Sequence, residues 1–137
     1  MNLFLILISL LLLPPAAFAG DFFQPVPMSE VVRLMKRPGV AIIDVNIQEL
    51  WEKHHITGAM HIERRKLAKQ LPADKSTTLI FYCAGPLCLE GSNAANDAIM
   101  LGFRRVYVMT DGIFTWVKAG YPVESAASSK RYGSVKR

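Results

Sequence analysis

The sequence predicts an α/β fold in which a central parallel sheet has helices on both faces. Short, apolar, β-branched runs at residues 40–43, 77–82 and 106–109 have the composition of buried strands. Helical patterns lie between and around these runs. Strands that alternate with helices are joined by crossover connections, which favour a parallel sheet covered on both sides.

The helices are predicted from their apolar spacing and from their start and stop signals. Ser29 is the expected N-cap of the first helix, and Gly102 and Gly120 are expected to end the last two. Asp111-Gly112 is the expected turn before the final helix. The predicted helices occupy residues 29–36, 48–54, 66–71, 92–101 and 113–119.

Residues 1–19 have the pattern of a signal peptide. Their apolar core, residues 3–13, is shorter than the roughly 20 residues that a spanning helix needs, and Ala17-Phe18-Ala19 fits a signal-peptidase site. We therefore expect a periplasmic or secreted protein, or a membrane-tethered one if this segment is not cleaved. No transmembrane span is expected in the mature chain.

Residues 20–124 are long enough for one domain, and residues 125–137 form an expected disordered basic tail. The formal net charge is +5, and four of the cations lie in this tail: Lys130, Arg131, Lys136 and Arg137. The domain itself is therefore close to neutral, and we expect no nucleic-acid partner.

Cys83 is the candidate nucleophile because it directly follows a predicted buried strand. Ligands of open parallel sheets bind beyond the carboxyl ends of the strands. A tight loop of successive amides before a helix can stabilise an anionic sulfur, whereas elsewhere a buried cysteine is usually a small hydrophobic residue. The predicted backbone cradle comprises Ala84, Gly85, Leu87, Cys88, Leu89, Glu90 and Gly91.

Asp44 also ends a predicted strand, so it is a candidate supporting residue that orients a loop amide or a substrate. Its alternative role is to cap a turn or helix. No metal is predicted, since the three histidines do not have the spacing of a zinc motif.

An ordered set of short motifs resembles the rhodanese-like domain family over nearly all of the predicted mature chain. The matching pieces are Ile43-Asp44-Val45, His55-Ile56-Thr57-Gly58-Ala59, Phe81-Tyr82-Cys83, Ala94-Ala95, Gly102-Phe103, Asp111-Gly112, Trp116, Gly120 and Pro122-Val123. The resemblance implies a parallel sheet of about five strands and a sulfurtransferase. In such an enzyme Cys83 takes a sulfane sulfur from thiosulfate or polysulfide as a persulfide and passes it to a thiol acceptor, a small molecule or a protein, without a cofactor.

The loop departs from the common form of that family, which begins with cysteine and ends with arginine. This loop has no arginine, and the matching position falls near Glu90; Asn46 also stands where many relatives have arginine. Cys88 is an additional thiol that could resolve a persulfide on Cys83. The alternatives are a thiol-disulfide or partner-binding module that uses Cys83 and Cys88 without sulfur transfer, and a silent scaffold.

Overall fold

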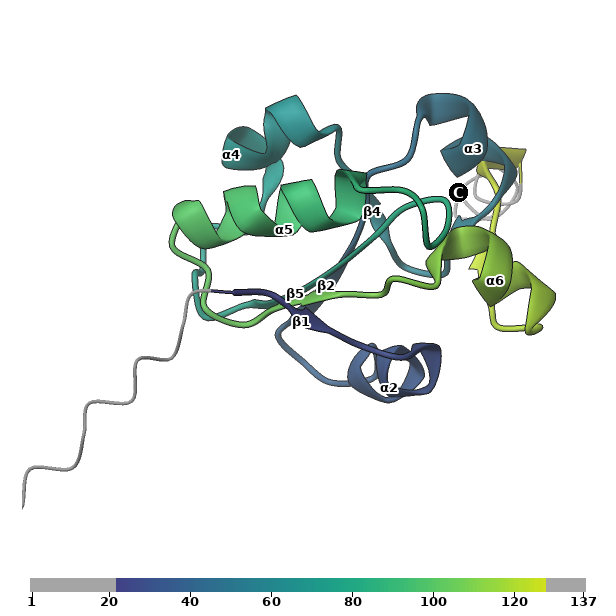
Figure 1. Ribbon diagram of the computed structural model, residues 1–137, viewed down its shortest axis with the longest axis horizontal. Coiled ribbons are helices and arrows are strands. Elements are labelled where there is room, and N and C mark those ends of the chain that lie inside the picture. The colour runs from purple at the N-terminus through teal and green to yellow at the C-terminus, as the bar shows by residue number, and fades with distance from the viewer. Residues whose placement is uncertain (1–21, 128–137) are drawn as a thin grey trace, which may run out of the picture.

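The computed structural model describes residues 22–127, so the signal segment predicted at residues 1–19 and residues 128–137 of the predicted tail lie outside it. Its centre is a five-stranded sheet with strand order β1-β6-β5-β2-β4 (Figure 1). All four pairings between neighbouring strands are parallel. The strands are β1 (Gln24–Pro25), β2 (Val40–Asp44), β4 (Met60–His61), β5 (Thr78–Tyr82) and β6 (Val106–Val108). The predicted α/β fold is confirmed.

Helices cover both faces of this sheet, as predicted. The helices α2 (Met28–Leu34) and α6 (Gly112–Lys118) contribute to the core on one face. On the other face lie α4 (Leu67–Gln70) and α5 (Glu90–Met100), on the opposite side of the sheet from α2 in Figure 1. The short helices α3 (Gln48–Lys53) and η2 (Arg64–Lys66) complete the connections.

The position of β5 in the sheet explains why its sequence is an almost uninterrupted hydrophobic run. All five of its residues are buried because the strand lies at the centre of the sheet. Leu79 and Phe81 pack into the core below α5, while Ile80 and Tyr82 pack into the opposite core with Trp116. The alternation of side chains along a strand therefore divides β5 between two hydrophobic cores.

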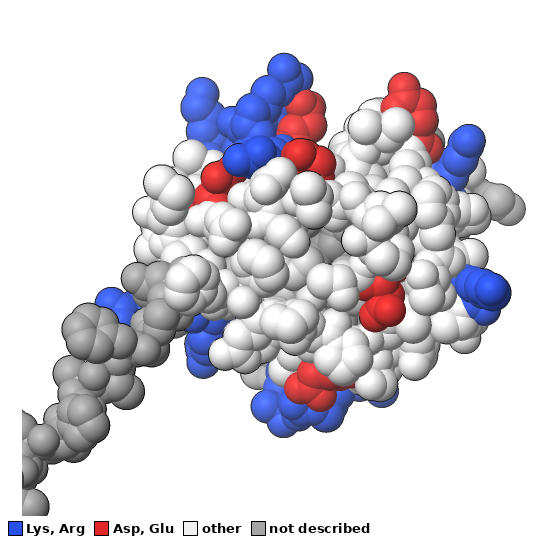
Figure 2. All heavy atoms as spheres, viewed as in Figure 1, with Lys and Arg blue, Asp and Glu red and all other residues white. Residues whose placement is uncertain are grey.

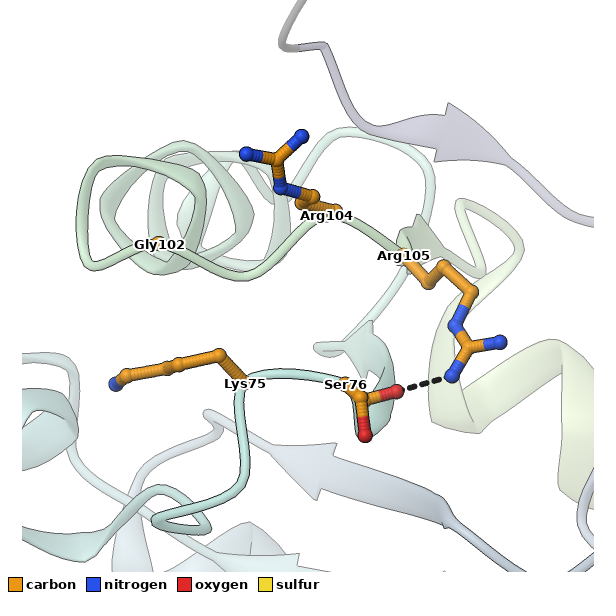
Figure 3. A pocket seen from close by; sticks show the side chains of 5 residues that line it. All are labelled: Lys75, Ser76, Gly102, Arg104 and Arg105. Atoms are coloured by element: carbon orange, nitrogen blue, oxygen red, sulfur yellow. Dashed lines mark hydrogen bonds between the residues drawn. The ribbon is translucent and has the colours of Figure 1, made fainter.

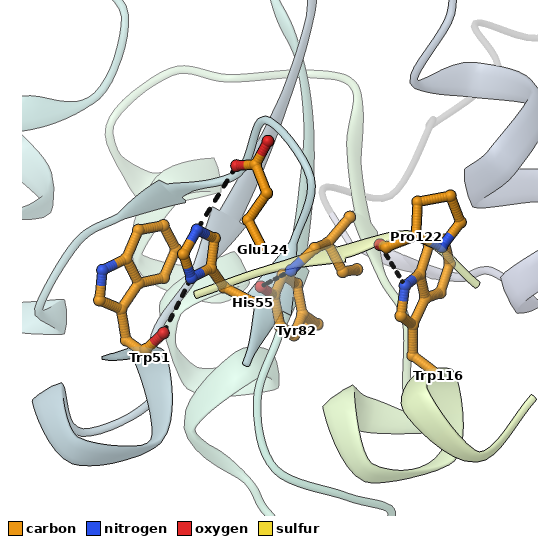
Figure 4. Close-up of polar contacts among 7 residues, drawn as sticks. Trp51, His55, Tyr82, Trp116, Pro122 and Glu124 are labelled. Atoms are coloured by element: carbon orange, nitrogen blue, oxygen red, sulfur yellow. Dashed lines mark hydrogen bonds and ion pairs between the residues drawn. The ribbon is translucent and has the colours of Figure 1, made fainter. Parts of the chain in front are cut away.

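A second, two-stranded sheet, β3 (His55–Ile56) with β7 (Val123–Glu124), is antiparallel and was not predicted. The Ile56 amide donates to the Tyr82 hydroxyl at 3.0 Å, and Trp116 Nε1 donates to the Pro122 carbonyl at 3.0 Å (Figure 4). His55 Nε2 lies 3.6 Å from Glu124 Oε2. These contacts hold the small sheet of β3 and β7 against β5 and α6.

Two predicted helix starts were wrong. Pro27, not Ser29, is the N-cap of α2, because its carbonyl already accepts hydrogen bonds from the amides of Glu30 and Val31. Helix α5 begins at Glu90 rather than at residue 92, since the Asn93 amide donates to the Leu89 carbonyl at 2.9 Å. The earlier start of α5 shortens the loop after Cys83.

Candidate active site

Cys83 directly follows the last residue of β5, at the carboxyl edge of the parallel sheet. Neighbouring strands β2 and β6 flank β5 on both sides, and only 4% of Cys83 is exposed. This is the edge at which open α/β sheets bind ligands. Cys83 therefore lies where the sequence predicted it, directly after a buried strand at this edge of the sheet, and its role as a nucleophile stays a prediction.

The loop after Cys83 is held against the start of α6 by backbone hydrogen bonds. The Ile113 amide donates to the Cys83 carbonyl at 2.9 Å, and the Phe114 amide donates to the Ala84 carbonyl at 3.2 Å. Within the loop, the Cys88 amide donates to the Gly85 carbonyl at 2.9 Å. The loop shape therefore depends on α6, from which α5 and β6 separate it in sequence.

Gly112 permits this close approach. Its φ is +74°, and a Cβ atom built there would lie 2.4 Å from the Gly85 nitrogen and 2.5 Å from the Ala84 carbonyl carbon and oxygen. Real Cβ atoms do not approach backbone atoms this closely. The sequence indicated only a turn at this position, whereas the structure makes Gly112 a determinant of the loop.

Cys83 and Cys88 form a disulfide in the structure. The Cys83 sulfur lies 3.3 Å from the Cys88 carbonyl oxygen, and the Cys88 amide points to Gly85. Cys88 N–H is thus occupied elsewhere in this oxidised state, although it was predicted to belong to the cradle. The remaining cradle amides stay a prediction for the reduced state.

Cys83 lines a small cavity of about 40 Å³. This volume is far below the roughly 300–1,000 Å³ that is typical of ligand pockets. The first turn of α5 also borders it, through Gly91 and Ser92. The lining residues are Cys83, Gly85, Pro86, Cys88, Leu89, Gly91, Ser92, Val108, Met109 and Thr110.

Two hydroxyl groups in this lining, Ser92 and Thr110, were not predicted as site residues. Ser92 lies in the first turn of α5, and Thr110 follows β6, the neighbour of β5. A parallel sheet brings the carboxyl ends of its strands to one edge. A polar residue that follows an apolar run is therefore expected at this edge, and this signal could have identified Thr110.

No lysine or arginine lines the cavity. Glu90 is exposed at the start of α5, and the basic residues of η2 are paired with carboxylates: Arg64 with Asp97, and Arg65 and Lys66 with Glu63. Blue and red side chains accordingly lie together over this part of the surface in Figure 2. Among residues 22–127, no cation lines the cavity in place of the absent loop arginine.

Asp44 does not reach the cavity. Strand β2 pairs Asp44 with Tyr82, and Ile42 and Tyr82 belong to the core opposite the one that contains Cys83. The Asp44 side chain and the Cys83 thiol therefore project from opposite faces of the sheet. Its Oδ1 accepts from the Asn46 amide at 2.7 Å, which is the turn-capping role.

The Asp44 carboxyl is fully buried, and its Oδ2 has no hydrogen-bond partner among the described residues. Burial raises the pKa of Asp44 above its ordinary 3.8, and this outweighs the opposing influence of Tyr82, Asn46 and His61. Burial and the Asp44 carboxylate likewise raise the pKa of Tyr82.

We expect Asp44→Asn to weaken the pH dependence of stability. A carboxyl whose pKa is raised by folding contributes stability that is complete below its unfolded pKa, near 3.8, and is lost as the pH rises through the folded value. The wild type should therefore lose more free energy of unfolding than Asp44→Asn between about pH 4 and pH 7.5. Urea unfolding at both pH values measures this, and parallel curves would contradict a raised pKa at Asp44.

The histidines near this end pack against Trp51. Its ring stacks on His55 at 3.5 Å and on His61 at 5.0 Å between centroids. His55 Nδ1 donates to the Trp51 carbonyl and His61 Nε2 to the Asn46 carbonyl, both at 2.8 Å. Within residues 22–127 there is no group of acidic, histidine or cysteine side chains suited to a metal, and no helix long and apolar enough to cross a membrane.

The fold and this site define an α/β protein with a cysteine-centred loop at the carboxyl edge of a parallel sheet. Residues 28–119 match the model of the rhodanese-like domain, so the chain belongs to the rhodanese-like domain family. The predicted family is confirmed.

The relatives and structural neighbours agree with this assignment. The chain is 30% identical over 105 residues to thiosulfate sulfurtransferase GlpE of Coxiella burnetii, a match that covers 76% of this chain and 95% of the relative. It is 27% identical over 110 residues to GlpE of Pseudomonas putida, covering 76% and 93% of the two chains. The crystal structure of BH2092 from Bacillus halodurans superposes with a TM-score of 0.69 at 28% identity, covering 78% of this chain and 80% of that one.

Proposed function

We propose that this protein is a sulfurtransferase that carries a sulfane sulfur as a persulfide on Cys83. The observation that carries the proposal is the place of Cys83, buried at the carboxyl end of the central strand and beside a cavity at the start of α5. Relatives that are named thiosulfate sulfurtransferases, at about 30% identity, support the same activity.

The proposed reaction has two displacements. The Cys83 thiolate attacks the outer sulfur of the donor, a Cys83 S–S bond forms, and the donor S–S bond breaks. With thiosulfate the leaving group is sulfite, and with polysulfide it is the shortened polysulfide. An acceptor thiolate then attacks the outer sulfur of the persulfide, becomes a persulfide itself and releases the Cys83 thiolate.

The surroundings of Cys83 favour anionic sulfur in both steps. The first-turn amides of α5 have no carbonyl partners within the helix, and a helix N-terminus attracts negative charge. The hydroxyl groups of Ser92 and Thr110 border the same cavity and can donate hydrogen bonds to the transferred sulfur.

The uncharged cavity lining favours a neutral organic polysulfide over anionic thiosulfate as the donor, because no guanidinium binds the sulfonate oxygens. We therefore expect Glu90→Arg to lower the KM for thiosulfate about tenfold and to change the KM for a neutral organic trisulfide little. Sulfite release measures the first reaction, and thiol-dependent sulfide release measures the second.

Glu90→Gln is the matched control, since it removes the negative charge without adding a cation. It should lower the KM for thiosulfate less than Glu90→Arg does. Equal effects of Glu90→Arg on the charged and the neutral donor would exclude an electrostatic role for this position.

Reduction of the disulfide must come before sulfur loading, because neither cysteine has a thiol while Cys83 and Cys88 are bonded. We propose that Cys88 also resolves the persulfide. Its thiolate would attack the Cys83 sulfur, the Cys83–Cys88 disulfide would form, and the outer sulfur would leave as hydrosulfide. A dithiol reductant then restores both thiols.

The alternative function is thiol-disulfide exchange or partner binding without sulfur transfer. The disulfide itself favours this alternative, because it is the product of two-electron oxidation of the pair. In the reaction, a partner dithiol would be oxidised to a disulfide while Cys83 and Cys88 are reduced.

A transfer assay distinguishes the two functions. The chain is reduced, freed of reductant, incubated with polysulfide, separated from excess donor and mixed with glutathione. The sulfurtransferase should form glutathione persulfide, or sulfide with further glutathione, in proportion to the protein loaded. Absence of glutathione persulfide from a Cys88→Ser chain, which cannot release the sulfur by internal resolution, would instead establish the redox alternative. We further propose that this activity lies outside the cytoplasm, as the pattern of residues 1–19 indicates.

A further inference from the structure

The end of the sheet opposite the Cys83 loop collects positive charge. All strands of a parallel sheet begin at one end, and cations precede three of them: Lys36 and Arg37 before β2, Lys75 before β5, and Arg104 and Arg105 before β6. All five are exposed. The connecting residues 35–39, 71–77 and 101–105 contain one acidic side chain, Asp74. We call this surface the basic end.

A hollow of about 550 Å³ lies at the basic end (Figure 3). The Arg105 guanidinium donates to the Ser76 carbonyl, and Lys75 Nζ lies 4.3 Å from the centre of the Phe103 ring, so both side chains are held at its rim. Among residues 22–127, neither Lys75 nor Arg104 forms a salt bridge. The lining residues are Lys75, Ser76, Gly102, Arg104 and Arg105.

Asp74 offsets only one of the five cations. Its Oδ1 accepts from the Ser76 amide at 2.8 Å and from the Ser76 hydroxyl at 2.7 Å. A second hollow of about 320 Å³ shares Ser76 and Arg105 with the first and adds Arg37 and Asp74 to its lining. The basic end is therefore a continuous cationic surface with two depressions.

Large apolar side chains stand at the same end. Phe22, just before β1, is 81% exposed, and Met100, at the end of α5, is 86% exposed. The chain also enters the domain here, as the start of the trace beside β1 and the end of α5 shows in Figure 1. The sequence that leads to this point contains the apolar residues 3–13. Cations combined with exposed aromatic and apolar groups are typical of surfaces that bind the lipid interface.

We propose that the basic end binds a membrane surface of anionic phospholipid. The headgroup phosphates interact with Lys75, Arg104 and Arg105, and Phe22 inserts at the interface. The Cys83 loop lies at the other end of the sheet and stays accessible to its acceptor. This orientation holds whether or not residues 1–19 are removed, because β1 begins at the basic end in both cases.

Vesicle flotation with the full chain tests the proposal. The probes are vesicles of phosphatidylcholine alone and of phosphatidylcholine mixed with phosphatidylglycerol. We expect phosphatidylglycerol to increase binding, and added salt to reverse the increase. Replacing Lys75, Arg104 and Arg105 together by glutamate should weaken binding to the mixed vesicles by about 100-fold or more, since each cation near an anionic surface contributes about a factor of five.

Lys53→Glu, Lys69→Glu and Lys118→Glu, combined in one chain, form the matched control. They make the same change in net charge at exposed positions on α3, α4 and α6. This control should keep most of the binding, and both triple variants should keep the thermal unfolding and sulfur loading of the wild type.

Four results would overturn the proposal. Equal binding to both kinds of vesicle would show that the apolar segment alone accounts for any association. An equal loss in the two triple variants would show that net charge, and not the basic end, matters. Release of the chain by millimolar inorganic phosphate at constant ionic strength, or tighter binding to duplex DNA than to mixed vesicles, would assign the basic end to a free anion or to nucleic acid.

Discussion

Gly112→Ala is expected to abolish most sulfur transfer and to lower the free energy of unfolding by about 3 kcal/mol. The new methyl group would lie 2.4 Å from the Gly85 nitrogen, and φ at this position is +74°. The contact is with backbone, so α6 and the loop must move apart. That movement would break the hydrogen bonds from Ile113 and Phe114 to the carbonyls of Cys83 and Ala84.

Gly91→Ala is the matched control, because Gly91 borders the same cavity but has room for a methyl group. Its Cβ would lie 3.6 Å from the Tyr82 backbone and from Val108, which is an ordinary contact. Alanine also favours the helix in which Gly91 lies by roughly 0.5–1 kcal/mol. Urea unfolding and sulfide release should place Gly91→Ala near the wild type. Wild-type values for Gly112→Ala would show that the close approach does not control the loop.

Cys83→Ser is expected to reduce sulfur transfer by at least about a thousandfold, because serine has no sulfur atom on which a persulfide can form. Cys88→Ser should retain loading of the first sulfur. Both variants lose the same disulfide, so any loss of stability caused by the missing bond is shared. The difference in their rates therefore reports the sulfur at position 83 and not the cross-link.

Cys88→Ser further separates the two roles proposed for Cys88. Without a resolving thiol, the persulfide should persist until an external thiol is added, whereas the wild type should release hydrosulfide by itself. If Cys88→Ser failed to load sulfur while Cys83→Ser loaded it normally, Cys88 would be the sulfur carrier and Cys83 the resolving thiol.

The parts of the fold that the sequence predicted are those set by local composition. Strand β5 is buried on both faces, so its residues after Thr78 are all hydrophobic, and the place of Cys83 follows from the end of that run. The strands β3 and β7 escaped prediction because each has two residues, and their pairing joins His55 to Glu124 across most of the domain. Such a pairing leaves no local pattern.

The site residues divide in the same way. Cys83 was identified by its position, but the contact between Gly112 and the loop joins segments that the sequence separates by β6 and α5. Asp44 was expected near the site because it ends a strand, and the face that it occupies is fixed by its register with Tyr82. That register is a property of the assembled sheet.

The basic end was hidden for a related reason. The net charge suggested a nearly neutral domain, and its cations are separated in sequence by about 30 to 40 residues, before β2, β5 and β6. A parallel sheet brings the beginnings of these strands to one end. The net charge of the whole sequence therefore did not reveal the positive charge that the topology brings together at the basic end.

The mass of the intact Cys88→Ser chain, measured after reduction, exposure to polysulfide and removal of excess donor, tests the central claim most directly. We expect the mass to rise by one sulfur atom, to return to its starting value on addition of a thiol, and to stay constant in a chain that also carries Cys83→Ser. A reduced Cys88→Ser chain that gains no sulfur, or a gain that survives the loss of Cys83, would contradict the account.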